Sequence, residues 1–181
     1  RAQLPITPQA HKRAILYSVS SVSLAARVLG KADKAREYLA QELEKQGFSV
    51  EVYRLNPFKY LTPKGINGKK VLADIPVLEF RKKYDVVFVI ADVQSFSTTN
   101  ERNLHWSIPM GPEIPWYAAE KPISVANPFH LYDVPMVPVC INTYNGSREA
   151  IRQAVEKITG KSEFKGNSPV DAFCGMWDTR L

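Results

Sequence analysis

The sequence has few of the residues that metal and redox sites require. Its 181 residues include only two cysteines, Cys140 and Cys174, and no Cys-x-x-Cys pair, so a disulfide framework is excluded. Cys140 lies in an apolar run, which predicts a buried thiol rather than half of a disulfide bridge. The three histidines, His11, His105 and His130, lack metal-ligand spacing such as H-E-x-x-H, so the sequence predicts no metal site.

The motifs of nucleotide-binding and esterase sites are also missing. Neither G-x-G-x-x-G nor G-x-x-x-x-G-K-[ST] occurs, and no G-x-S-x-G nucleophile elbow is present. The serine-rich residues 18–23 have the hydroxyl donors of a flavodoxin-type phosphate loop near a helix N-terminus. Serine is equally an ordinary turn residue, so this segment alone predicts no cofactor.

Long apolar runs and clustered charge are absent as well. The longest apolar run, residues 86–91, is far short of the ~20 residues that span a bilayer and instead suits a buried strand. The net charge is +6, but the basic residues are scattered and form no run of five. We therefore predict a mildly basic, solvated surface and no nucleic-acid partner.

The composition that remains is that of a packed globular domain. Hydrophobic residues make up 45% of the chain and charged residues 23%, which argues against disorder, and the length fits one domain. Periodicity predicts strands at residues 13–19, 48–55, 85–91, 122–126 and 135–141. Helices are predicted at residues 33–46, 71–83 (interrupted by Pro76), 112–119 and 147–158.

Strands that alternate with helices predict a three-layer α/β/α sandwich. The sheet is expected to be mainly parallel, with five or six strands and a flavodoxin-like outline. Ligands of such sheets bind where the strands end at the carboxyl edge. Four polar segments follow predicted strands and are expected to meet at this edge: residues 18–23, 92–106, 126–133 and 142–146.

Three stretches carry a resemblance to a known family. They are DVQSFSTTNERNLHWSIPMGPEIPWY, SVANPFHLYDVPMVPVCINTYN and GKSEFKGNSPVDAFCGMWDTRL. Together they resemble the C-terminal domain of two-domain bacterial glycoside hydrolases of family 3, in the β-N-acetylhexosaminidase branch. The resemblance is close over residues 80–181 and loose before them. The opening LPITP resembles the family's linker, which implies a linker over residues 1–12 and the domain over residues 13–181.

The resemblance implies that catalysis belongs to another part of a longer chain. The family's first domain is a (β/α)8 barrel that holds the terminal sugar, the aspartate nucleophile and, in this branch, an Asp-His acid/base pair. A barrel needs ~250 residues and has a different pattern, so no catalytic residue is expected in this chain. In the glucosidase branch the acid/base can come from the second domain, which leaves Glu101 and Glu113 open.

The resemblance also implies what the chain does. It is expected to be an inactive accessory domain whose parent enzyme hydrolyses terminal β-N-acetylhexosaminides with retention, with the barrel and the carbohydrate substrate as its partners. Polar and aromatic composition at the carboxyl edge favours four residues for the substrate entrance or the domain interface. These residues are Arg102, Trp106, Asn127 and His130.

Two other functions remain open from the residues themselves. One is a stand-alone, flavodoxin-like module that binds a nucleotide, a flavin or a sugar, although the missing glycines count against it. The other is a purely structural dimerisation domain. The sequence indicates no cofactor, and it contains no signal for a particular cellular compartment.

Overall fold

Five parallel strands form the centre of the structure. The computed structural model of the chain describes residues 3–20, 34–53, 77–92, 106–107, 114–127 and 139–166. In the main sheet the strand order is β2-β1-β3-β6-β7, and every neighbouring pair is parallel. The strands are β1 (Arg13–Ser20), β2 (Ser49–Val52), β3 (Val86–Asp92), β6 (Ile123–Asn127) and β7 (Cys140–Asn142). An α/β fold with a parallel sheet is thus confirmed.

The central strand β3 is apolar along its length because both of its faces are covered. Its residues 86–91 are all at most 1% exposed. Phe88 and Ile90 belong to one hydrophobic cluster, whereas Val87 and Val89 belong to a second cluster on the opposite face. This alternation explains why the sequence shows a continuous apolar run instead of a polar-apolar alternation.

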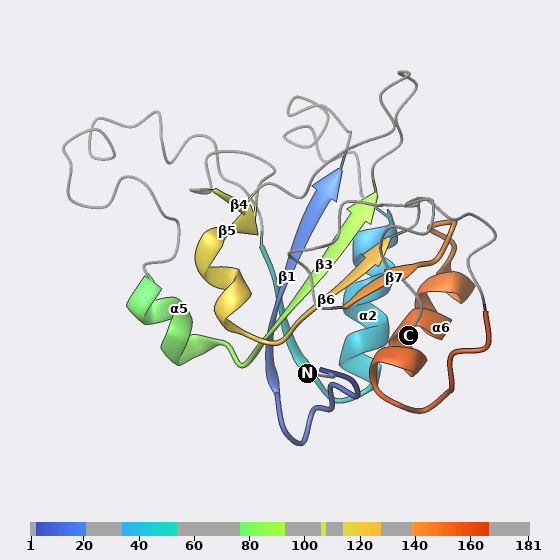
Figure 1. Cartoon of the computed structure of the whole chain (residues 1–181), viewed down its shortest axis with the longest axis horizontal. Coiled ribbons are helices and arrows are strands. Elements are labelled where there is room, and N and C mark those ends of the chain that lie inside the picture. Colours follow the sequence, from blue (N-terminus) through green and yellow to red (C-terminus); the bar gives the residue numbers. More distant parts are fainter. Residues whose placement is uncertain are drawn as a thin grey trace, which may run out of the picture.

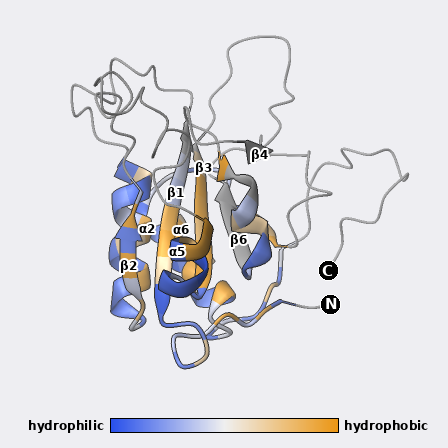
Figure 2. Ribbon diagram, turned by 90° about the vertical axis from the view of Figure 1, so that its left-hand side faces the viewer, coloured by the Kyte–Doolittle hydropathy of each residue, from blue (hydrophilic) through white to orange (hydrophobic). Residues whose placement is uncertain are grey.

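Helices cover the two faces of the sheet (Figure 1). On one face α2 (Lys34–Lys45) and α6 (Arg148–Ile158) pack Leu39, Leu43 and Ile151 into the first cluster. On the other face α5 (Val77–Lys83) and the 3-10 helix η1 (Trp116–Glu120) supply Phe80 and Tyr117 to the second cluster. In Figure 2 the hydrophobic residues concentrate in β1 and β3, while α2 also carries many hydrophilic ones.

The ends of α2 and α6 follow from local sequence signals. The Ser147 side chain caps α6 by accepting a hydrogen bond from the Ala150 backbone N–H at 3.3 Å. Gly47 after α2 has φ 101° and Gly160 after α6 has φ 75°, and glycine adopts this left-handed backbone without steric cost. Both helices were predicted with these stop signals, and their bounds agree with the prediction.

Two predicted elements need correction. Residues 112–119 were expected to be helical, but Ile114–Pro115 forms the short strand β5 and only the following residues turn into η1. Proline disfavours a helical conformation in the residue before it, which keeps Ile114 extended. The strand expected at residues 48–55 is β2 (Ser49–Val52) in the structure, and its last predicted residues, 54 and 55, lie outside the described ranges.

The other predicted elements agree in kind. α5 (Val77–Lys83) is the second half of the helix expected at residues 71–83, and the preceding residues lie outside the described part. The same holds for residues 135–138 before β7. Within the described ranges, no helix has the length and apolar character needed to cross a membrane.

Candidate functional site at the carboxyl edge of the sheet

Four strand ends meet at one edge of the sheet, as the sequence predicts. In the register of the sheet, Ser20 at the end of β1 pairs with Asp92 at the end of β3. Likewise Asn127 at the end of β6 pairs with Asn142 at the end of β7. All strands point the same way, so these residues share the carboxyl edge, at the arrowheads in Figure 1. This is the place where parallel α/β sheets bind ligands.

Of the four predicted site residues, the structure describes the backbone of two. Asn127 is the last residue of β6 and lies directly at the carboxyl edge. Trp106 belongs to the short strand β4 (Trp106–Ser107), which pairs with β5 in a separate two-stranded sheet. Arg102 and His130 lie outside the described residues.

The remaining candidates also fall largely outside the described ranges. Glu101 and Glu113, kept open as acid/base residues, are not described, and neither are residues 21–23 of the serine-rich turn. Ser18 is described within β1 and is half-buried. Among the described residues, no group of three or more His, Cys, Asp or Glu side chains could hold a metal ion.

The turn between β7 and α6 contains residues 142–146, one of the four polar segments predicted at this edge. The Thr143 hydroxyl donates to the Asn145 carbonyl at 2.9 Å, and the Asn145 side-chain oxygen accepts from the Ser147 backbone N–H at 2.9 Å. Tyr144 between them has φ 61° and is 48% exposed. A left-handed backbone conformation is uncommon for tyrosine. Residues in such strained conformations cluster at functional sites. The Asn-Gly pair in TYNGS signals a turn but not which residue becomes left-handed.

An aromatic pair lies behind the end of β1. The ring of Tyr17, which is buried, lies 4.9 Å from the ring of Tyr53 in a tilted arrangement. The Tyr53 backbone N–H donates to the Leu16 carbonyl at 2.9 Å and so continues the pairing of β1 with the chain after β2. Tyr17 belongs to the second hydrophobic cluster, and Tyr53 packs against that cluster.

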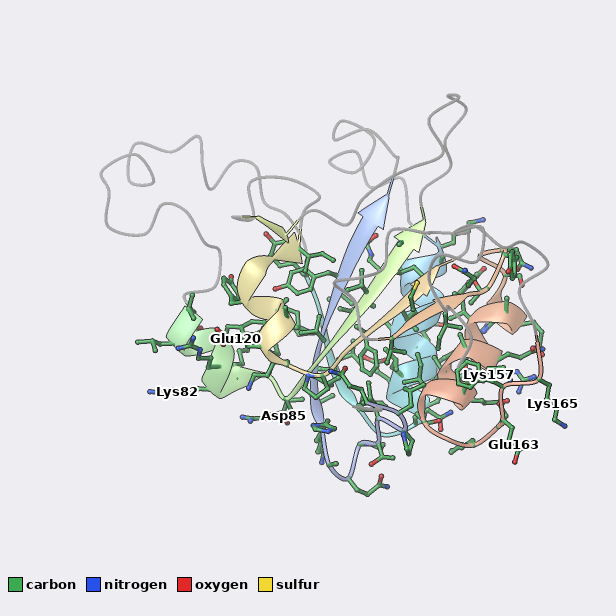
Figure 3. The ribbon with its side chains drawn as sticks, in the orientation of Figure 1. Lys82, Asp85, Glu120, Lys157, Glu163 and Lys165 are labelled. Carbon is green, nitrogen blue, oxygen red and sulfur yellow. The ribbon has the colours of Figure 1, made fainter. Side chains whose placement is uncertain are left out.

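One strong ion pair lies at the end of the sheet opposite the carboxyl edge. At the amino ends of β1 and β3, Arg13 makes a bidentate contact with Asp85, with Nε–Oδ2 at 3.1 Å and Nη2–Oδ1 at 2.6 Å. The Arg13 hydrogen bonds lower the pKa of Asp85 to about 2. Figure 3 shows Asp85 near Lys82, at the end of the sheet opposite the arrowheads. This pair joins two strands and is structural.

Two helix carboxylates, Glu120 and Glu42, also form ion pairs. Arg81 of α5 binds Glu120 of η1 at 2.6 Å, and this hydrogen bond lowers the pKa of the Glu120 carboxyl. Glu42 of α2 is 3% exposed and accepts from Lys45 at 2.7 Å. Arg148 of α6 lies 3.5 Å from the same carboxylate. Each charge has an ion partner, so neither contact resembles an acid/base site.

Cys140 is free and unsuited to nucleophilic chemistry. Burial raises the pKa of its thiol to about 12, so the thiol stays protonated at neutral pH. The whole residue is half-buried in β7 and packs against the second cluster, in agreement with the predicted buried thiol. Cys174 lies outside the described residues.

The chain is similar to parts of longer known proteins. No family model matches the chain. A "Beta-N-acetylglucosaminidase/beta-glucosidase" of Cellulomonas fimi is 32% identical over 183 residues, which cover 98% of this chain and 30% of that protein. The solved structure of "Beta-glucoside phosphorylase BglX" matches with a TM-score of 0.67 at 28% identity, over 98% of this chain and 29% of that one.

A third relation concerns the fold alone. A fungal multi-domain GH3 β-N-acetylglucosaminidase matches with a TM-score of 0.51 at 16% identity, over 90% of this chain and 16% of that one. The structure is a parallel α/β domain, and it is similar to one part of longer proteins whose names specify action on glycosides. These matches are consistent with the resemblance of the chain to a domain of glycoside hydrolase family 3, and the chain spans about 30% of the length of the curated relative.

Proposed function

We propose that this chain is the accessory C-terminal domain of an enzyme that cleaves terminal β-N-acetylglucosaminides. The observation that carries the proposal is the match of 98% of the chain to only 30% of a β-N-acetylglucosaminidase/β-glucosidase. The rest of such a protein has room for a (β/α)8 barrel, which needs ~250 residues and would hold the catalytic groups.

The proposed position of the domain follows from its edges. The strand order β2-β1-β3-β6-β7 supports our proposal of a flavodoxin-like doubly wound outline, and ligands of such sheets sit at the carboxyl edge. We therefore place the carboxyl edge toward the mouth of the barrel, where it shapes the substrate entrance. Arg102, Trp106, Asn127 and His130 are the residues proposed to contact the carbohydrate or the barrel. Residues 1–12 are proposed as the linker between the two domains.

The experiment that tests the function compares the complete gene product with the 181-residue chain. Both are assayed with nitrophenyl β-N-acetylglucosaminide and nitrophenyl β-glucoside. We expect the complete protein to cleave the N-acetylglucosaminide and the 181-residue chain to be inactive. A complete protein without activity on either glycoside contradicts the proposal. It would turn attention to the stand-alone binding module, for which ligand binding at residues 18–23 is the first measurement.

One observation favours a second candidate for the reaction. The phosphorylase BglX matches 98% of this chain at 28% identity, and its name specifies transfer of a glycosyl group to phosphate. In hydrolysis a water oxygen forms the new bond to the anomeric carbon, and the free sugar is released. In phosphorolysis a phosphate oxygen forms that bond, and a sugar 1-phosphate is released. Product analysis with and without inorganic phosphate separates the two reactions. Hydrolysis gives free N-acetylglucosamine under both conditions.

A further inference from the structure

Most of the proposed linker packs against this domain and contributes to its core. Residues 3–12, here called the strap, cross the ends of α2 and α6 at the amino end of the sheet (Figure 1). Ile6 of the strap is 0% exposed and belongs to the first hydrophobic cluster, against which Leu4 also packs. The Ile6 backbone N–H donates to the Ile158 carbonyl at 2.8 Å, so the strap also caps the last turn of α6.

Two helix-ending glycines lie directly under the two prolines of the strap. A Cβ atom at Gly160 would come within 3.0 Å of Pro5 Cβ, and one at Gly47 within 3.7 Å of Pro8 Cγ. The approach at Gly160 is closer than ordinary van der Waals contact, so a Cβ atom there would require Pro5 to shift by a few tenths of an ångström. The strap thus rests on the C-terminal ends of both helices of one layer.

The second half of the strap is fixed as firmly as the first. The Thr7 carbonyl accepts from the backbone N–H groups of Ala10 and His11 at 3.2 and 2.9 Å, which closes a turn. The Lys12 carbonyl accepts from the Ser49 N–H at 2.8 Å and so continues into the pairing of β1 with β2. The strap contains two prolines and neither glycine nor serine, unlike a flexible linker.

We propose that the strap is a rigid mount that holds a preceding domain of the same chain in one orientation. The proposal rests on the proposed function only for the existence of that domain. The strap itself is not a flexible tether, because buried packing and backbone hydrogen bonds hold it to this domain from residues 4 and 6 onward. Rigid attachment sets the geometry between domains without a large interface.

The mount also constrains where the preceding domain lies. The strap is at the amino end of the sheet, and the proposed substrate edge is at the carboxyl end (Figure 1). The eight residues of β1 separate the two ends by about 25 Å, at about 3.3 Å a residue. A barrel that is held at the strap and also meets the carboxyl edge must therefore extend along the side of this domain.

The first experiment is hydrogen exchange of the complete gene product, read at the Ile6 amide. A rigid mount predicts protection of this amide comparable to that of the core amides of β3, such as Val87. Exchange at the rate of an unstructured segment would overturn the proposal without any variant. The same protein, spin-labelled at the exposed Gln41 of α2 and on the preceding domain, should give one narrow distance distribution.

Two matched variants separate the mount from general stability. Gly160→Ala and Gly47→Ala both force a left-handed backbone on alanine, but only the first presses on the strap at 3.0 Å. We expect Gly160→Ala to raise the exchange rate of Ile6 at least tenfold and to broaden the distance distribution. Gly47→Ala should do neither. Equal effects of the two variants on exchange and distance contradict the proposal.

The outcomes also distinguish the mount from the function. A complete protein with glycosidase activity and a broad distance distribution overturns the mount and leaves the function standing. A narrow distance distribution in a complete protein without glycosidase activity supports the mount and overturns the proposed function. A gene product with no domain before the strap overturns both.

Discussion

Single residues of this domain show how contacts within the fold, and not residue type alone, assign a role. Asp85 lies between α5 and β3, and the sequence predicts it only as the first residue of a strand. In the structure it accepts hydrogen bonds from the Arg13 backbone N–H at 2.9 Å and from the Arg13 guanidinium. The Arg13 side chain also donates to the Lys82 carbonyl at 2.8 Å. One arginine therefore locks the starts of β1 and β3 to the end of α5.

Replacement of Asp85 should change how stability depends on pH. Its pKa is lowered to about 2 in the folded protein, so its contribution is present above the ordinary carboxyl pKa. The contribution is lost as pH falls from about 4 toward 2. Asp85→Asn should flatten the decline of the urea midpoint over this range, and Arg13→Gln should have the same effect. A decline parallel to that of the unaltered protein in both variants contradicts the pairing.

At the scale of elements, local signals specified the helices and the apolar strand well. Ser147 and Gly160 mark the ends of α6, and the continuous apolar run marks β3. The short elements were harder because their conformation depends on contacts. Ile114 becomes a strand residue through its pairing with Trp106, 8 positions earlier, and through Pro115 after it. The apolar periodicity of residues 112–119 does not predict that pairing.

The turn between β7 and α6 offers a test of stored backbone strain. Tyr144 has φ 61°, a conformation that costs an ordinary residue about 1–2 kcal/mol, while glycine adopts it freely but loses about 0.5–1 kcal/mol of chain entropy. We expect Tyr144→Gly to raise the free energy of unfolding by up to about 1 kcal/mol in urea titrations. Tyr144→Ala keeps the strain and serves as the control.

The comparison of the two variants also bears on function. If Tyr144→Gly proves less stable than Tyr144→Ala, backbone strain is not the dominant effect at this position. If Tyr144→Gly gains stability while the complete enzyme loses activity, strain at the carboxyl edge serves the active enzyme.

At the scale of the whole molecule, the two ends of the sheet differ in the residues that lie at them. The amino end is closed by the strap and by the Arg13–Asp85 pair. The carboxyl end collects the polar strand ends Ser20, Asp92, Asn127 and Asn142. We propose that the amino end serves attachment and that the carboxyl end faces the substrate, a division that the parallel direction of the strands allows.

The proposed role of the carboxyl end predicts a loss of activity in the complete enzyme. We expect Arg102→Ala and His130→Ala to lower kcat/KM at least tenfold, which corresponds to about 1.4 kcal/mol of transition-state stabilisation. Lys12→Ala, an exposed change at the amino end, should leave kcat/KM unaltered. Unchanged kcat/KM and unchanged association of the domains in both edge variants contradict the assignment. Glu101→Gln and Glu113→Gln belong in the same series, because a shifted pH profile would identify an acid/base residue.

The sequence by itself predicted the class of fold, the resemblance to a family of glycoside hydrolases and most of the long elements. These depend on local information: apolar periodicity, capping residues, and motifs such as SPVDAFCGMWDT that need no partner to be recognised. Only the tertiary structure decided the seating of the strap, the left-handed Tyr144 and the pairing of Arg13 with Asp85. Residues 5 and 160 come together because folding brings the two ends of the described chain side by side, and no local pattern records a contact at that separation.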